Sequence, residues 1–113
     1  MGARTNYTIV TTNNPAQNIN VYSHWDGEES VAIMQQAIRT AMPRINDISY
    51  CTRIIIDQLT KYGRDTETGY GIHIGEHIRA EEEYDYKEIN LVNKTITVDQ
   101  MQFNILEFVE VLV

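Results

Sequence analysis

Two adjacent helical patterns in the middle of the chain restrict its fold more than any other feature. The first has apolar residues at helical spacing: Val31, Met34, Ile38, Ala41 and Met42. It runs into Pro43, which disfavours helix at the residue before it. The second begins near Asn46 or Asp47, has one apolar and one charged face, and reaches a helix-ending Gly63. Each helix must bury its apolar face against another element, so a purely β fold is excluded.

Strand patterns flank these helices on both sides. Residues 5–12 and 17–25 are rich in β-branched and aromatic residues and surround turn formers at 13–16, which predicts a hairpin. From Tyr70 to Ile78 apolar residues alternate with glycine and histidine, which predicts a strand that Gly75 interrupts. Residues 87–92 and 95–98 predict a second hairpin.

Two helix starts are expected from capping-box pairs, in which each side chain satisfies a backbone N–H of the first turn. Asp26 with Glu29 precedes the first helix. Asp99 with Gln102 precedes the tail, whose polar residues fall at helical spacing: Gln100, Asn104 and Glu107. We therefore expect a C-terminal helix from Asp99, although the apolar residues of the tail would also suit a strand.

The expected fold is α+β: a two-layer arrangement with a mainly antiparallel sheet and two central helices packed on one face, in the order ββααβββα. Residues 1–113 are expected to form a single domain, because 113 residues is one domain's length. The single cysteine, Cys51, excludes an internal disulfide and is expected in the core. No apolar run approaches the roughly 20 residues that span a bilayer, and no hydrophobic signal segment opens the chain, so no membrane partner is expected.

The net charge of -7 is unevenly distributed. Residues 39–64 hold five bases and two acids, a net +3, whereas residues 65–113 hold eleven acids and three bases, a net -8. Affinity for nucleic acid comes from Lys and Arg along the phosphate backbone, so general nucleic-acid binding is not expected. A local site for an anion stays open in the middle third.

Motifs for catalysis are weak. Residues 73–77 fit the H-x-x-E-H pattern of one zinc peptidase class, with His73, Glu76 and His77 as the chemical groups. That chemistry needs both histidines on one helical turn, whereas this segment is strand-like, so the plainer interpretation is two ordinary histidines on one strand face. A looser metal set of His24, Asp26, Cys51, His73 and His77 lacks ligand spacing. Neither a metal nor a cofactor is expected.

A recognition surface is the stronger prediction. Residues 22–27 form a dense aromatic and polar junction between strand and helix, of a kind enriched in ligand sites. The alternative is that Trp25 fills the core and Asp26 only caps. Arg53 and Arg64 would hold an anion through their bidentate forks, or Arg53, Asp57 and Lys61 would simply pair along the helix. The candidate ligand-binding residues are Tyr22, His24, Trp25, Arg53, Arg64, Tyr70 and His73.

One sheet face is also expected to need a cover. If both helices pack on the other face, this one carries a mixed set of side chains: Val10, Tyr22, His24, Gly71, His73 and Val92. Homo-oligomer packing or a ligand would cover it.

Three segments, residues 2–6, 21–27 and 66–71, together resemble small proteins of unassigned role encoded by tailed bacteriophages. The likeness covers most of the chain. It implies the cytoplasm of a bacterial host, where Cys51 stays reduced. It also implies a counter-defence role, either by sequestering a nucleotide signal or by blocking a host protein.

These observations lead to three functional hypotheses. The first is a non-enzymatic, homo-oligomeric protein that sequesters a small anionic ligand such as a nucleotide immune signal. The second is an acidic inhibitor of a host defence or nucleic-acid-binding protein, using acids after residue 66: Glu67, Glu76, Glu81, Glu82, Glu83, Asp85 and Glu88. The third is a zinc-dependent hydrolase built on His73, Glu76 and His77.

Overall fold

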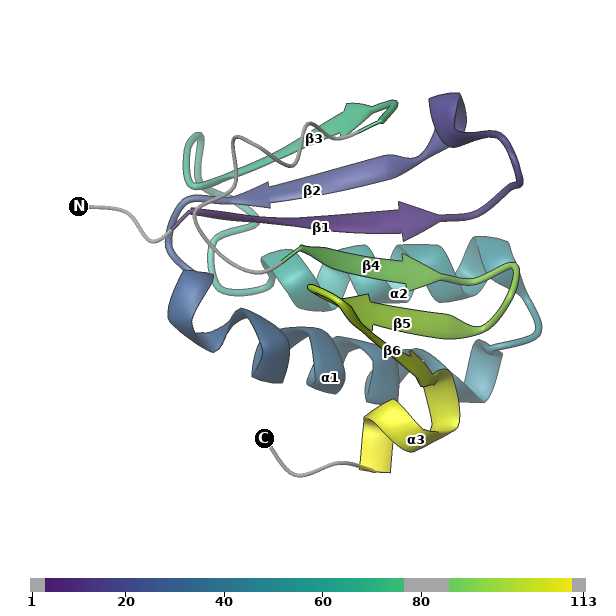
Figure 1. The fold of residues 1–113 in the computed structure, drawn as a ribbon. Helices are drawn as coiled ribbons and strands as arrows, with labels where there is room; N and C mark the ends of the chain where they lie inside the picture. The colour runs from purple at the N-terminus through teal and green to yellow at the C-terminus, as the bar shows by residue number, and fades with distance from the viewer. Residues whose placement is uncertain (1–3, 77–85, 111–113) are drawn as a thin grey trace.

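The structure is a computed structural model and describes residues 4–76 and 86–110 (Figure 1). Its strands form one six-stranded sheet in the order β3-β2-β1-β4-β5-β6. The strands are β1 (Thr5–Val10), β2 (Ile19–Ser23), β3 (Tyr70–Ile74), β4 (Lys87–Asn90), β5 (Thr95–Val98) and β6 (Met101–Asn104). The helices are α1 (Ser30–Ala41), α2 (Ile48–Thr60) and α3 (Ile105–Glu110), with short 3-10 turns at Pro15–Gln17, Gly27–Glu29 and Met42–Arg44.

Strand β1 lies inside the sheet between two partners of opposite direction. It pairs antiparallel with β2 and parallel with β4, whereas the other neighbouring strands pair antiparallel. The α+β class and the mainly antiparallel sheet predicted from the sequence are therefore confirmed.

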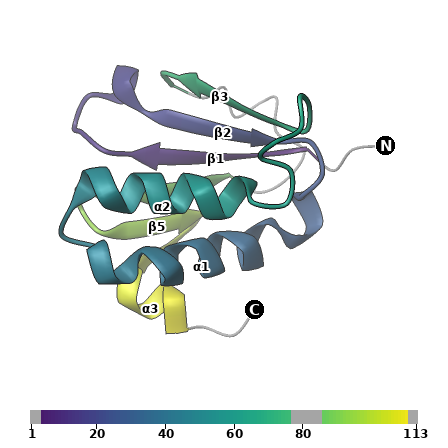
Figure 2. The same cartoon turned by 180° about the vertical axis from the view of Figure 1, so that it is seen from behind.

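Helices α1 and α2 lie side by side against one face of the sheet, as Figures 1 and 2 show from opposite sides. Side chains alternate along a strand, so Tyr7 and Ile9 of β1 point toward these helices while Asn6 and Thr8 point away. The core between sheet and helices is fully buried: Tyr7, Ile9, Val21, Met34, Ile38, Cys51, Ile55, Leu59, Ile89, Leu91 and Ile96. Each such aliphatic side chain stabilises the fold by about 1.5–3 kcal/mol through burial.

The predicted C-terminal helix from Asp99 is wrong in its first half. Met101–Asn104 is strand β6, paired with β5, and the helix begins only at Ile105. The order is accordingly ββααββββα, one strand more than predicted. Asp99 has a φ of 55°, a left-handed conformation that belongs to a turn and not to a helix cap.

The capping box predicted at Asp26 is also wrong. Asp26 makes no side-chain cap bond, and α1 begins at Ser30 after the 3-10 turn. Ser23 supplies the local contact instead, since its Oγ accepts hydrogen bonds from the backbone N–H groups of Trp25 at 3.3 Å and Asp26 at 3.1 Å. Asp47 does cap α2, accepting from the backbone N of Tyr50.

Strand β3 ends at Ile74, and Gly75 adopts a φ of 127°, so the predicted interruption at Gly75 ends the strand. Residues 77–78 of that prediction lie outside the described residues. Among the residues that the structure describes, no helix is long and apolar enough to cross a bilayer.

Candidate functional site

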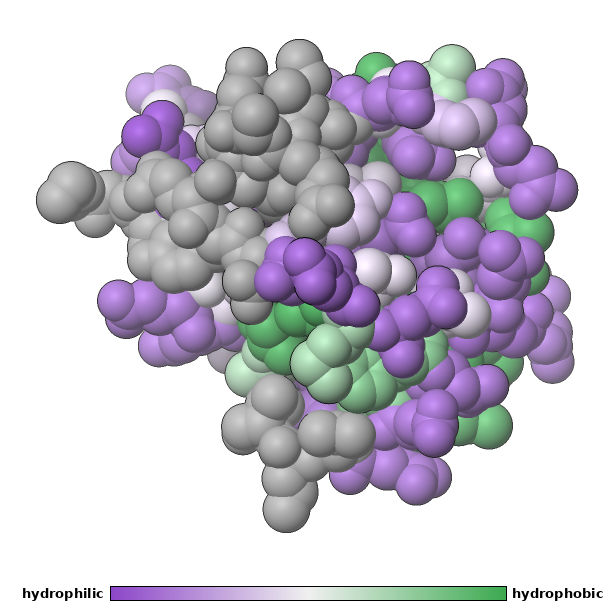
Figure 3. Space-filling view, in the orientation of Figure 1, coloured by the Kyte–Doolittle hydropathy of each residue, from purple (hydrophilic) through white to green (hydrophobic). Residues whose placement is uncertain are grey.

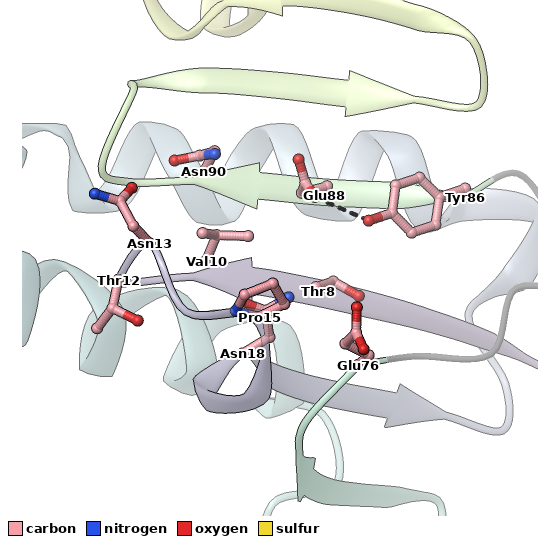
Figure 4. Close-up of a pocket in the computed structure, with 10 residues that line it drawn as sticks. All are labelled: Thr8, Val10, Thr12, Asn13, Pro15, Asn18, Glu76, Tyr86, Glu88 and Asn90. Atoms are coloured by element: carbon pink, nitrogen blue, oxygen red, sulfur yellow. Dashed lines mark hydrogen bonds between the residues drawn. The ribbon is translucent and has the colours of Figure 1, made fainter.

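A polar pocket of about 360 Å³ lies on the sheet face opposite α1 and α2 (Figure 4). The residues that line it are Thr8, Val10, Thr12, Asn13, Pro15, Asn18, Glu76, Tyr86, Glu88 and Asn90. Its floor is the parallel pair of β1 and β4, in which Thr8 lies opposite Glu88 and Val10 lies opposite Asn90. We call this hollow the sheet-face pocket.

The connection between β1 and β2 forms one side of the sheet-face pocket. Asn14 caps the 3-10 turn, its Oδ1 accepting from the backbone N of Ala16 at 3.1 Å. Pro15 occupies the first position of that turn, where its missing N–H costs nothing. Thr12 Oγ1 accepts from the backbone N of Asn14 at 3.1 Å and donates to Gln17 Oε1 at 2.9 Å. These bonds fix a tight loop at the rim.

Glu76 reaches the pocket from the far end of β3. The backbone N of Gly75 donates to Asn18 O at 2.8 Å, and Asn20 Nδ2 donates to Gly75 O at 2.6 Å. The same Asn20 side chain accepts from Thr8 Oγ1 at 2.8 Å through Oδ1. A buried polar ladder on the sheet therefore holds the segment that carries Glu76.

The opposite side of the pocket comes from β4 and the residue before it. Tyr86 donates through its hydroxyl to Glu88 Oε1 at 2.9 Å. Asn90 Oδ1 accepts from the backbone N–H groups of Val92 at 3.0 Å and Asn93 at 2.9 Å, an arrangement that closes the turn after β4. The side chains of Glu88 and Asn90 are therefore positioned by contacts with residues close to them in the chain.

Asn18 also lines the pocket, and its side-chain oxygen is buried. Its side chain is 9% exposed, and its Oδ1 has no hydrogen-bond partner among the described residues. Leaving a buried carbonyl oxygen unpaired costs about 1–3 kcal/mol, so such an atom calls for a partner that the described residues do not supply.

The surroundings of the pocket are hydrophilic. In Figure 3, which shows this side of the molecule, polar residues predominate where the described residues reach the surface. Glu76 and Glu88 bring two carboxylates to the lining, and neither Lys nor Arg is among the described residues that line it.

None of the seven sequence-predicted binding residues lines the sheet-face pocket. Tyr22 and His24 lie together, with the Tyr22 hydroxyl 3.0 Å from His24 Nδ1. His73 is exposed on β3 and pairs in register with Asn20. These three residues lie on or beside the same open face but outside the hollow.

Trp25 and Tyr70 meet at the start of β3. Their ring centroids are 5.7 Å apart in an edge-to-face arrangement, and Trp25 is 50% exposed. Trp25 therefore does not fill the core, and its place in a recognition surface stays a prediction. The ring also lies against Gly69, whose carbonyl accepts from the backbone N of His24 at 2.8 Å.

Polar groups gather beneath Trp25. Burial raises the pKa of Asp26, while hydrogen bonding with Ser23 and Tyr70 acts in the opposite direction. Burial also raises the pKa of Tyr70, and the Asp26 carboxylate adds to that shift. The pKa of Tyr7 is raised by burial first and by Asp26 second. The negative charge of Asp26 thus raises the pKa of two tyrosines at the end of the sheet where β1 begins.

The two predicted arginines are not brought together. Arg64 pairs with Asp57 at 3.0 Å and, with Tyr70, lines a second hollow of about 330 Å³ beside α2. Arg53 is exposed on α2, about two helical turns before its end, and does not line that hollow. The predicted pairing along α2 is also replaced, since Asp57 bonds Arg64 beyond the helix.

The described part of the chain contains no site that would support either metal hypothesis. Tyr70–Ile74 is a strand, so His73 is not on the helical turn that the zinc pattern needs, and His77 lies outside the described residues. Within residues 4–76 and 86–110 no three His, Cys, Asp or Glu side chains are grouped as metal ligands. Cys51 is buried in the core, and burial raises the pKa of its thiol.

Sequence reasoning missed most of the pocket because it followed aromatic and basic residues. The available signal was a period-two pattern of amide, hydroxyl and carboxylate side chains: Asn6 and Thr8, then Asn18 and Asn20, then Glu88 and Asn90. Of the acids assigned to the protein-inhibitor hypothesis, Glu76 and Glu88 line the pocket and Glu67 is exposed. The others, Glu81, Glu82, Glu83 and Asp85, lie outside the described residues.

No protein family, curated protein or solved structure matches this chain.

Proposed function

We propose that the protein is a non-enzymatic binding protein that captures a small polar ligand in the sheet-face pocket. The observation that carries this proposal is the unpaired Oδ1 of the nearly buried Asn18 in the wall of a polar hollow. The volume of about 360 Å³ falls within the range of small-molecule sites. The lining offers amides, hydroxyls and carboxylates, which orient a ligand by hydrogen bonds.

The test is mass spectrometry of small molecules released when the purified protein is denatured. Val10→Trp places a large ring on the pocket floor, and Gln102→Trp places the same ring on the same sheet face but two strands away from the lining of β4. We expect a molecule from the wild type and from Gln102→Trp, and its loss from Val10→Trp. Equal recovery from both variants, with both folded by circular dichroism, would place the ligand elsewhere.

A small anionic ligand, such as a nucleotide signal, is the second candidate. It is favoured by one observation: Arg64 and Tyr70, two of the predicted residues, line the same hollow. A guanidinium and an aromatic ring are the groups that bind a phosphate and a base. Calorimetry with cyclic and linear nucleotides tests it, with Arg64→Gln expected to weaken binding and the exposed Arg53→Gln expected to leave it unchanged. An equal loss in both variants would indicate only diffuse charge attraction.

Homo-oligomerisation, a phage origin and action in the bacterial cytoplasm belong to the same proposal. Support for self-association comes from edge strand β3, where Ile72 and Ile74 are exposed at 55% and 63%. Exposed apolar residues on the outermost strand of a sheet favour contact with another chain. Light scattering of the purified protein measures the mass directly.

A further inference from the structure

Three hydroxyl groups line the described part of the sheet-face pocket, and each already uses its proton in a hydrogen bond within the protein. Thr8 Oγ1 donates to Asn20 Oδ1, Thr12 Oγ1 donates to Gln17 Oε1, and the Tyr86 hydroxyl donates to Glu88 Oε1, at distances of 2.8–2.9 Å. A hydroxyl has one proton to donate and lone pairs that can accept. Toward a ligand these three groups can therefore only accept.

Among the described residues that line the pocket, the charged ones are both acidic. Glu76 and Glu88 face the pocket from opposite sides, as Figure 4 shows, and neither meets a Lys or Arg among the lining residues. In the described part of the lining, the side-chain donors that remain are the neutral amides of Asn13, Asn18 and Asn90. A carboxylate or phosphate would meet like charges here, whereas a cation would form charge-assisted hydrogen bonds.

Asn18 gives a separate reason to expect a ligand that donates a hydrogen bond. Its Oδ1 is buried and unpaired, and its side chain is 9% exposed beside the pocket. An ordered water could supply one hydrogen bond, but a ligand N–H at this position would satisfy the oxygen and also neutralise the nearby carboxylates.

We infer that the sheet-face pocket binds a small organic cation that carries several N–H groups, an alkylammonium or a guanidinium compound. This inference rests on the proposed function, that the pocket holds a small ligand, and it names the chemistry of that ligand. The ligand presents its positive end to Glu76 and Glu88 and an N–H to Asn18 Oδ1. The anionic ligand of the second candidate function would occupy the separate hollow at Arg64.

The experiment is calorimetry with three four-carbon probes that differ in charge: putrescine, 1,4-butanediol and succinate. Agmatine is added as a probe with a guanidinium group. We expect measurable binding of putrescine or agmatine, at least ten-fold tighter than of the diol, and no binding of succinate. Binding should weaken as salt is raised, because the attraction involves charges near the surface.

Two variants remove the charges without changing side-chain size. Glu88→Gln and Glu76→Gln should each weaken binding of the cation about ten-fold or more, since each removes one charge-assisted hydrogen bond. Glu28→Gln is the matched control, because Glu28 is exposed on the turn before α1 and makes the same change in net charge. It should leave the affinity unchanged.

The outcomes separate the inference from the proposed function. If the diol binds as tightly as putrescine and Val10→Trp abolishes that binding, the pocket holds a ligand but the cation is wrong. If Glu28→Gln weakens binding as much as Glu88→Gln, the attraction is diffuse and the assigned site is wrong. If no probe binds and no molecule is released from the wild type, both the inference and the proposed function fail.

Discussion

Gly69 contacts a distant part of the chain, the segment that holds His24 and Trp25. Its φ of 102° is a conformation that L side chains rarely adopt, and its carbonyl accepts from the backbone N of His24. A Cβ at this position would overlap the ring of Trp25. The residue therefore lets the aromatic ring pack closely against the backbone that leads into β3.

Gly69→Ala should lower the free energy of unfolding by about 2–4 kcal/mol, because it adds backbone strain to a clash with a large ring. Urea denaturation measures this loss. Gly71→Ala is the control, since a Cβ there meets nothing within 4 Å and the backbone is ordinary strand. Equal stability of the two variants would mean that the Trp25 ring moves aside without cost.

The sequence of residues 22–27 could indicate that Trp25 belongs to a contact region, but it could not indicate which residues Trp25 contacts. Aromatic and polar side chains at a strand end indicate a contact region without saying what they contact. The partners, Gly69 and Tyr70, become neighbours only because β3 pairs antiparallel with β2 and brings Tyr70 opposite Ser23.

The tail shows how pairing between elements overrides a local pattern. Phe103 of β6 lies opposite Ile96 of β5, and its ring packs 5.6 Å from that of Phe108. The helical stripe that suggested one long helix does contain a true helix start. Asn104 Oδ1 accepts from the backbone N of Leu106 at 2.8 Å, and Glu107 Oε1 accepts from the backbone N of Asn104 at 3.2 Å. The capping box is real but lies five residues later than predicted.

Helix α3 is held by side chains of α1 that bond its last carbonyls. Gln35 Nε2 donates to Phe108 O at 2.8 Å, and Arg39 Nε donates to Val109 O at 2.7 Å. The final carbonyls of a helix have no partner within the helix, so these bonds replace the missing ones. Gln35 is also buried, which explains why a polar residue stands on the inner face of α1.

Gln35→Ala should destabilise the protein by about 1–3 kcal/mol, because Phe108 O would lose a buried hydrogen bond. Thermal denaturation gives the change in stability, and amide hydrogen exchange should rise most in α3. Gln36→Ala, at the exposed neighbouring position, should change neither. Exchange that rises evenly over the whole chain would argue against a local role in docking α3.

The helices and the hairpins of the fold could be predicted because their signals are local. Periods of 3.6 and 2 lie within a few residues, and turn formers mark the connections. The parallel pairing of β1 with β4 could not be predicted, since nothing in either segment specifies a partner so distant in the chain. The pocket was missed for the same reason, because its floor is that pair.

The stability of the whole molecule should depend on pH through Asp26. Its pKa is raised above the ordinary 3.8 by burial, so the folded state favours the protonated form. The contribution of this group is complete below about pH 3.8 and is lost as the pH rises through the raised value. At neutral pH the charged carboxylate therefore opposes folding.

Asp26→Asn keeps the shape and removes the charge. It should be more stable than the wild type at pH 7, with the advantage disappearing toward pH 3. Urea denaturation across this range checks the sign. Asp65→Asn, an exposed change of the same charge, should show no such trend. A constant difference between Asp26→Asn and wild type at every pH would mean that packing, and not ionisation, is responsible.

The parallel pairing of β1 with β4 also determines when the pocket can form during synthesis of the chain. One half of the sheet-face pocket, residues 8–18, leaves the ribosome long before the other half, residues 86–90. Contacts between segments so far apart form late, because the intervening chain must first be made and its ends brought together. In a nascent chain that ends before β4, β1 lacks the strand that pairs with it on one side. The pocket therefore comes into being only after most of the chain has been synthesised, so unfinished chains cannot compete with the finished protein for whatever it holds.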